Sequence, residues 1–270
     1  MEGFAQYLIS VNIVTLSQLF VLMFPLVVFC SLMNVVSLYS AKYGCLALGR
    51  RPYLYIFGWL GVSVHELGHL VFAVLMNHRI DEVALFTPDS EHGLGYIRHS
   101  YDRYSIYQNL GNLFIGLGPI LLGILLLHGL SSMLFGFSVA KTSTFAITSN
   151  AMLNLAVVES VIMPNLWDNI LRFAYLVLYS DSSTWWKVAL LLYCLCAIGG
   201  ALTLSVSDIL GAGKGFVAFV FVLLTLNMLT LWIGDFTRNA FSFVSYYFSW
   251  FYFLVLLCMF VNVCFVLLMF

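Results

Sequence analysis

The chain has 270 residues, of which 62% are hydrophobic and only 9% are charged. Soluble domains carry about 25% charged residues, so this composition excludes a soluble globular protein, and its apolar content excludes a disordered one. The net charge of −1 provides no basic surface for nucleic acid, so we expect no nucleic-acid partner. What remains is an integral multi-pass membrane protein, for which the lipid bilayer is the main solvent. We expect it in the cell membrane, and we expect residues 1–270 to form a single domain.

Stretches without charged residues predict the membrane spans. Five stretches of at least 20 residues lack Asp, Glu, Lys and Arg, and about 20 residues of helix cross a hydrocarbon core of about 30 Å. A sixth candidate is interrupted only by Glu66. We therefore predict an all-α polytopic membrane protein with about six transmembrane helices, at residues 15–38, 53–76, 107–132, 186–208, 215–235 and 243–268. The apolar stretch 143–161 contains Glu159 and is predicted to insert only in part.

The segment between the second and third predicted spans differs from the rest of the chain because it is rich in charge. Residues 83–87 and 94–97 are predicted to form short strands around a turn at 88–90, within a membrane-associated β segment at about 80–100. An exposed strand edge here would bind an extended peptide by strand addition.

The second predicted span contains the sequence His65-Glu66-Leu67-Gly68-His69, which has the HExxH pattern. On a helix, His65 and His69 lie at i and i+4, so both imidazoles project from one face and can bind one metal ion. Glu66 is then placed to act as general base on a water at the metal. Ionisable residues within a span usually mark function, because burying them in lipid is costly. The pattern therefore predicts a zinc site with Glu66 as the catalytic residue.

A catalytic zinc ion usually has a third protein ligand, and the sequence leaves three acidic candidates open. Asp208 ends the predicted span 186–208, and it can reach the histidine pair only if that span is offset or broken. Glu159 lies in the apolar stretch 143–161, and Asp168 follows Trp167. The structural alternative for Asp208 and Asp168 is a helix cap, whereas for Glu159 it is a neutral hydrogen-bonded acid.

Other polar residues have weaker patterns. Asn109 and Asn112 begin the third predicted span, where they either orient substrate backbone or join helices by hydrogen bonds. The remaining four histidines lack the spacing of metal ligands, and we expect them to be interfacial or solvated. The six cysteines lie mostly in apolar stretches and show no CxxC pattern, so we expect neither disulfides nor a thiolate zinc site.

Together these motifs resemble the site-2-protease family of intramembrane zinc metalloproteases. The resemblance rests on His65–His69 within a span, the strand-rich segment ending Gly93-Leu94-Gly95-Tyr96, the stretch Asn112–Pro119, and Ser205–Ala212, which reads Ser-x-x-Asp-x-x-Gly-Ala. It covers roughly residues 53–212, which would form the catalytic core. The third zinc ligand of the family is an aspartate of a later span, which maps best onto Asp208. The family's Leu-Asp-Gly-Gly motif is absent from this chain.

The resemblance implies a zinc metalloendopeptidase that hydrolyses peptide bonds of membrane-protein or peptide substrates. His65, His69 and Asp208 would hold Zn²⁺ and Glu66 would be catalytic, while a regulatory membrane partner remains open. The alternative is a metal-binding membrane protein without proteolysis, which would be a transporter, a sensor or an inactive protease-like scaffold. A transporter or sensor needs the two histidines but does not need Glu66, whereas an inactive scaffold needs neither and carries no stoichiometric metal.

Overall fold

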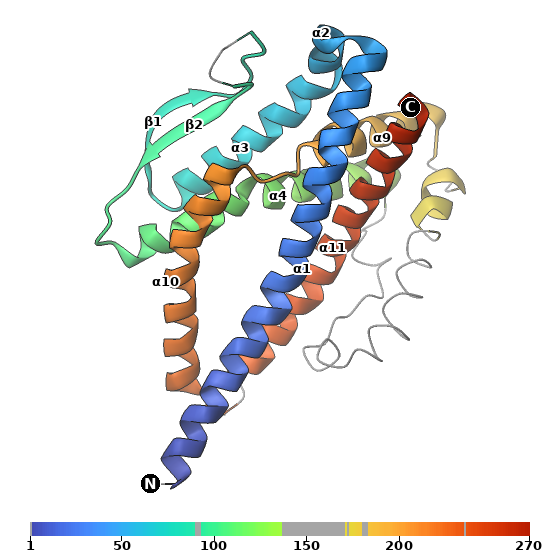
Figure 1. The fold of residues 1–270 in the computed structure, drawn as a ribbon. Helices are drawn as coiled ribbons and strands as arrows, with labels where there is room; N and C mark the ends of the chain where they lie inside the picture. Colours follow the sequence, from blue (N-terminus) through green and yellow to red (C-terminus); the bar gives the residue numbers. More distant parts are fainter. Residues whose placement is uncertain (1, 90–92, 137–170, 172, 180–182, 235) are drawn as a thin grey trace.

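The computed structural model describes residues 2–89, 93–136, 171, 173–179, 183–234 and 236–270. The described part of the chain is mostly helical and carries one small sheet (Figure 1). In chain order its elements are α1 (Glu2–Leu48), α2 (Arg50–Tyr53), a π-helical turn η1 (Leu54–Gly58), α3 (Trp59–Leu75), β1 (Arg79–Ala84), β2 (Tyr96–Ser100), α4 (Ile106–Phe135), α9 (Trp185–Gly200), α10 (Val206–Thr230) and α11 (Phe236–Met269). The predicted helical fold with a small β segment is therefore confirmed.

Five of the described helical segments are long and apolar enough to cross a membrane. They are Gly3–Leu48, Arg50–Leu75, Ile106–Phe135, Val206–Thr230 and Phe251–Met269. Figure 1 shows α1 and α11 running side by side, and these two helices pack against each other. The predicted partial insertion at 143–161, together with the candidate ligands Glu159 and Asp168, falls outside the described residues.

The predicted span 186–208 is wrong in its second half. Helix α9 has 16 residues and ends at Gly200, which makes it about 24 Å long at 1.5 Å per residue. The chain then continues without helical structure to Ser205, the N-cap of α10, which begins at Val206. The predicted span 215–235 therefore starts too late, because α10 already begins at Val206. The physical reason is that Asp208 and Lys214 belong to the first turns of α10 and do not end a preceding helix.

Polar side chains of α1 hold the chain where α9 ends. The Asn34 side chain accepts a hydrogen bond from the Leu204 backbone N–H at 3.2 Å and donates one to the Leu204 carbonyl at 3.3 Å. Ser37 donates to the Gly200 carbonyl at 2.5 Å. These bonds satisfy backbone groups that a continuous helix would have paired internally.

The small sheet is an antiparallel pair of β1 and β2, with Val83 opposite Ile97 and Ala84 opposite Tyr96. The sequence predicts strands at 83–87 and 94–97, so the predicted hairpin is present, but its paired residues lie closer along the chain to α3 and α4. Beyond the ladder, Thr87 N–H still donates to the Leu94 carbonyl at 2.6 Å. Hydrophobic alternation is short here, which explains why the boundaries were displaced.

Helix α3 ends in a Schellman motif. Asn77 has a positive φ of 56°, Asn77 N–H donates to Val74 O, and His78 N–H donates to Ala73 O. This reversal directs the chain from the end of α3 into β1 and leaves the His78 side chain buried. The sheet is thereby placed beside α3, with which both strands are in contact (Figure 1).

Close contacts at small residues bring α3 and α10 together on either side of α4. A Cβ added at Gly68 of α3 would lie 2.6 Å from the Pro119 backbone of α4. A Cβ added at Gly116 of α4 would lie 2.7 Å from both the Asp208 carbonyl and the Ala212 side chain of α10. Small residues are the usual means by which membrane helices approach closely. The backbone of α10 at Asp208 is thus pressed against the helix that also contacts α3.

Gly68→Ala is expected to destabilise the protein by about 1–3 kcal/mol, because the new methyl group meets backbone atoms that have no free space. Gly129→Ala in α4 is the matched control, because a Cβ there meets nothing within 4 Å. Thermal unfolding of both variants in the same detergent checks this prediction. Equal midpoints for the two variants would contradict the close α3–α4 contact.

Candidate metal centre

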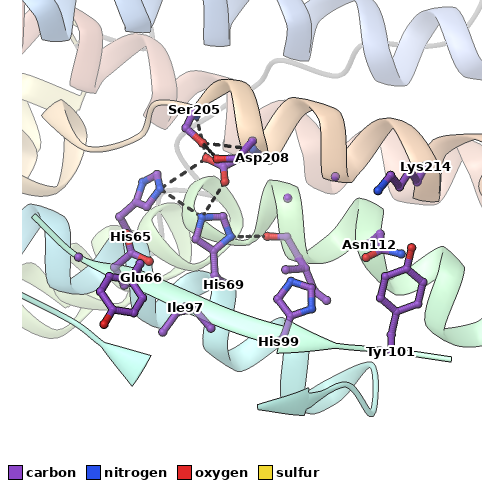
Figure 2. Close-up of a pocket in the computed structure, with 16 residues that line it drawn as sticks. His65, Glu66, His69, Ile97, His99, Tyr101, Asn112, Ser205, Asp208 and Lys214 are labelled. Carbon is purple, nitrogen blue, oxygen red and sulfur yellow. Dashed lines mark hydrogen bonds and ion pairs between the residues drawn. The ribbon is translucent and has the colours of Figure 1, made fainter. Parts of the chain in front are cut away.

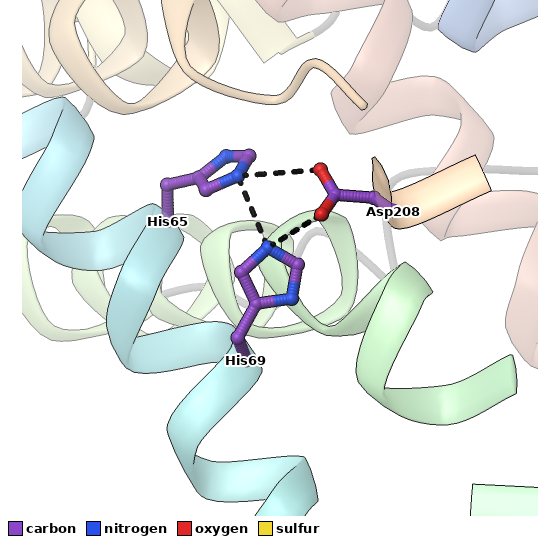
Figure 3. A group of neighbouring side chains, drawn as sticks. All are labelled: His65, His69 and Asp208. Atoms are coloured by element: carbon purple, nitrogen blue, oxygen red, sulfur yellow. Dashed lines mark hydrogen bonds and ion pairs between the residues drawn. The ribbon is translucent and has the colours of Figure 1, made fainter. Parts of the chain in front are cut away.

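Three side chains from two helices converge in the structure (Figure 3). His65 and His69 come from successive turns of α3, and Asp208 comes from the first turn of α10. One ligand atom from each residue can be chosen so that all three lie within 4.8 Å of one another. The two Nε2 atoms are 3.2 Å apart, and the His69 Nε2 lies 3.3 Å from Asp208 Oδ1. The predicted histidine pair and the predicted distant aspartate are therefore neighbours.

The hydrogen bonds behind the two histidines determine which ring nitrogen faces the group. His65 Nδ1 lies 2.9 Å from the Ala201 carbonyl, and His69 Nδ1 lies 2.8 Å from the Ile115 carbonyl. A carbonyl oxygen only accepts, so each Nδ1 carries a proton, and each Nε2 presents a lone pair when the imidazole is neutral. Outer-shell carbonyls that orient histidines in this way are typical of metal sites.

The arrangement has the ligand atoms that a bound cation needs. Two lone pairs and a carboxylate face one another, and none of these atoms has a proton to share when both histidines are neutral. A cation between them would remove this repulsion. Tetrahedral zinc with Zn–N distances of about 2.0–2.1 Å places two nitrogen ligands about 3.3 Å apart. The observed separation of 3.2 Å between the Nε2 atoms agrees with that geometry.

Asp208 is oriented by the helix start that it helps to form. Ser205 is the N-cap of α10, its hydroxyl accepts from Asp208 N–H at 3.1 Å, and Asp208 Oδ2 accepts from Ser205 N–H at 2.7 Å. This is a capping box, in which two backbone donors of the helix start are satisfied reciprocally. Oδ1 remains directed toward His69. The cap and the candidate ligand are thus the same carboxylate.

Glu66 lies beside the group, one residue after His65 on α3. The residue is 8% exposed, and its carboxylate has no hydrogen-bond partner among the described residues. The backbone of Gly95 packs over the Glu66 side chain, since a Cβ at Gly95 would lie 2.8 Å from Glu66 Cγ. A carboxylate beside this group without a partner among the described residues is available to a water molecule.

The group borders a cavity of about 500 Å³ between α3, α4, α10 and the β2 region (Figure 2). Its wall is formed by His65, Glu66, His69, Gly95, Tyr96, Ile97, His99, Tyr101, Asn112, Ile115, Gly116, Ser205, Ser207, Asp208, Gly211 and Lys214. A second, more apolar cavity of about 800 Å³ lies between α1, α2, α3 and α9. Both cavities include His65, Glu66, Gly95 and Ser205. His65 and Glu66 therefore lie between the first cavity and the more apolar one, whereas His69 borders the first cavity alone.

The cavity distinguishes the two asparagines predicted at the start of the third span and adds two residues to its wall. Asn112 lines the cavity, whereas the side chain of Asn109 donates to the carbonyls of Arg103 and Ser105 at the start of α4. His99 and Lys214 line the cavity, although the sequence did not mark either as a site residue. No sequence spacing links them to α3. All six cysteines are free, as expected.

Comparisons with family models, curated proteins and solved structures find no match to this chain.

Proposed function

We propose that the protein is an intramembrane zinc metalloprotease. The observation that carries the proposal is the convergence of His65, His69 and Asp208, with the histidine lone pairs directed inward and Glu66 beside them. HExxH helices with a third, distant ligand form zinc sites that keep one coordination position open for chemistry. Five apolar helices long enough to cross a membrane support a reaction site within the bilayer.

The proposed residue roles follow from this geometry. His65, His69 and Asp208 would hold the ion, which when bound would polarise the scissile carbonyl and acidify the attacking water. Glu66 takes the proton of the attacking water and later delivers it to the leaving amine nitrogen. The capping box of α10 keeps the Asp208 carboxylate in position throughout. The carbonyls of Ala201 and Ile115 keep both imidazoles in one tautomer.

The two cavities suit a substrate that is itself part of a membrane protein. Hydrolysis at membrane depth needs water, and the polar cavity beside the histidine pair supplies space for it. The apolar cavity on the other side of His65 is lined by residues such as Leu38, Phe57 and Ala197, which match a hydrophobic peptide segment. The proposed substrate is therefore an apolar segment that enters from the lipid side and meets water at the cleavage point.

Removing the metal is the experiment that tests the proposal. A panel of fluorescence-quenched peptides taken from membrane-spanning segments should be cleaved by the purified protein in detergent. Cleavage should stop after dialysis against 1,10-phenanthroline and return when one equivalent of Zn²⁺ is added. Cleavage that continues at full rate in protein shown to be metal-free would contradict the proposed function.

A further inference from the structure

A second pair of histidines adjoins the polar cavity. His78, 6% exposed, follows α3, and His99 lies on β2. Their Nδ1 atoms are 3.0 Å apart, and His78 Nε2 lies 2.9 Å from the Gln108 carbonyl. The Tyr101 ring stacks on His78 with a centroid distance of 5.0 Å and an interplanar angle of 18°. The His78 ring is thus fixed by a hydrogen bond on each nitrogen and by a ring on one face.

This chain of hydrogen bonds determines both tautomers. The Gln108 carbonyl can only accept, so His78 Nε2 carries a proton. The Nδ1 of neutral His78 is then an acceptor, and the short contact requires His99 Nδ1 to be the donor. Neutral His99 therefore has its lone pair on Nε2. The buried His78 acts as the group that sets the tautomer of its partner.

The free nitrogen of His99 belongs to the cavity side of the ring. His99 lines the polar cavity and His78 does not, so the edge opposite Nδ1 is the one left for the cavity. Nε2 has no hydrogen-bond partner among the described residues, and it is not sealed from solvent. Burial and the neighbouring His78 lower the pKa of His99, while Asp81 raises it less. His99 is therefore a neutral hydrogen-bond acceptor at pH 7.

The wall of the same cavity contains a buried donor without a partner among the described residues. Asn112 of α4 is 5% exposed and lines the cavity, and its Nδ2 is buried without a hydrogen-bond partner among the described residues. A buried amide without a partner costs stability, so its retention in a cavity wall points to a ligand that satisfies it. Figure 2 shows Asn112 and His99 on the same side of the cavity, away from His65.

We infer that this wall binds the main chain of an extended peptide, with His99 Nε2 accepting a hydrogen bond from a peptide N–H and Asn112 Nδ2 donating one to a peptide carbonyl. The inference rests on the proposed proteolytic function and adds the class of substrate contact. An acceptor and a donor in the wall of one cavity match a peptide unit, which has one of each. Backbone groups inside a helix are already paired, so the wall selects a segment that has unwound. Recognition through the main chain leaves the side-chain sequence largely free.

The tautomer is measured first, on metal-free protein labelled with ¹⁵N-histidine. Long-range ¹H–¹⁵N spectra distinguish a protonated Nδ1 from a protonated Nε2, and His78→Phe and His99→Phe assign the signals. We expect His99 to be protonated at Nδ1 in the wild type and to return to the Nε2–H form in His78→Phe, which keeps an aromatic ring against Tyr101. A wild-type His99 protonated at Nε2 would overturn the inference.

Peptide binding is measured next, on Co²⁺-substituted protein. The probes are trileucine hydroxamates that extend on either side of the metal, with each amide N–H replaced in turn by an ester oxygen. At one position the ester should weaken wild-type binding about two- to tenfold, which is the usual contribution of one hydrogen bond. The ratio of the amide probe's affinity to that of the ester probe should fall to about one in His99→Phe. It should remain in Arg98→Gln, a control on the same strand whose exposed side chain pairs with Glu82.

Asn112→Leu separates a binding role from a structural one. The variant loses no hydrogen bond of the described structure, so the unfolding midpoint should not fall, whereas hydroxamate binding should weaken severalfold. If the amide-to-ester affinity ratio of His99→Phe equalled that of the wild type, with Co²⁺ still bound, the inference would be overturned and the proposed function would remain intact. Absence of Co²⁺ binding in the wild type would overturn the proposed metal site, and the ring signals of metal-free protein would then decide the His99 assignment.

Discussion

Glu66→Gln is expected to lower the rate of peptide cleavage by about 10²- to 10⁴-fold, the usual contribution of a general base. Glutamine keeps the size of the side chain but cannot accept the proton of the attacking water. Zinc should remain bound at the wild-type ratio, because the grouped ligand atoms belong to His65, His69 and Asp208 and do not include Glu66. Cleavage rates and metal content of the same purified sample check both parts.

The same substitution decides between proteolysis and a role confined to metal binding. A transporter or sensor needs the two histidines and should keep its function when Glu66 loses its charge. Glu82→Gln serves as the control, because Glu82 lies on β1, pairs with Arg98 at 3.0 Å and is outside the cavity wall. Full cleavage activity in Glu66→Gln would sink the assignment of Glu66 as the base.

Asp208→Ala is expected to weaken zinc binding by more than the roughly 10- to 100-fold that loss of an outer-shell partner costs. The substitution removes two things at once, a candidate ligand and half of the capping box of α10. Ser205→Ala removes the capping hydroxyl and keeps the carboxylate, so it measures the cap alone, which contributes about 1 kcal/mol. Competition with a zinc-binding dye compares the two affinities.

Two further variants complete this comparison. Asp168→Ala and Glu159→Ala remove the other acidic candidates that the sequence left open, and we expect both to keep wild-type zinc affinity. If either variant lost zinc while Asp208→Ala retained it, the third ligand would be wrongly assigned. If Ser205→Ala lost as much affinity as Asp208→Ala, the effect would belong to the helix start and not to the ligand.

The local part of the candidate site could be predicted from the sequence, because it depends only on helix periodicity. His65 and His69 are four residues apart on one helix, so their convergence follows from 3.6 residues per turn. The sequence placed Asp208 near the histidine pair only on the condition that the predicted span 186–208 is offset or broken. That break occurs at 201–205, and Asn34 of α1 holds it through two hydrogen bonds with Leu204. The local sequence of α1 does not predict this contact between residues that are 170 positions apart.

His99 could not be predicted as a cavity residue, because its contacts depend on the hairpin and on the end of α3. The Schellman motif at Asn77 places His78 opposite β2, and only then does the His78–His99 pair form. The predicted strands were displaced by several residues for a related reason: alternation over four or five residues defines a strand but not its register. Tertiary pairing decides such boundaries.

The central claim is that two histidines and one carboxylate of this chain bind a catalytic zinc ion. X-ray absorption spectroscopy of the purified wild-type protein tests it most directly. We predict one zinc per chain, with nitrogen and oxygen neighbours at about 2.0–2.2 Å, the multiple scattering of two imidazoles, and no sulfur neighbour. Zinc with sulfur at about 2.3 Å, or a protein that binds no metal after incubation with Zn²⁺, would contradict the claim.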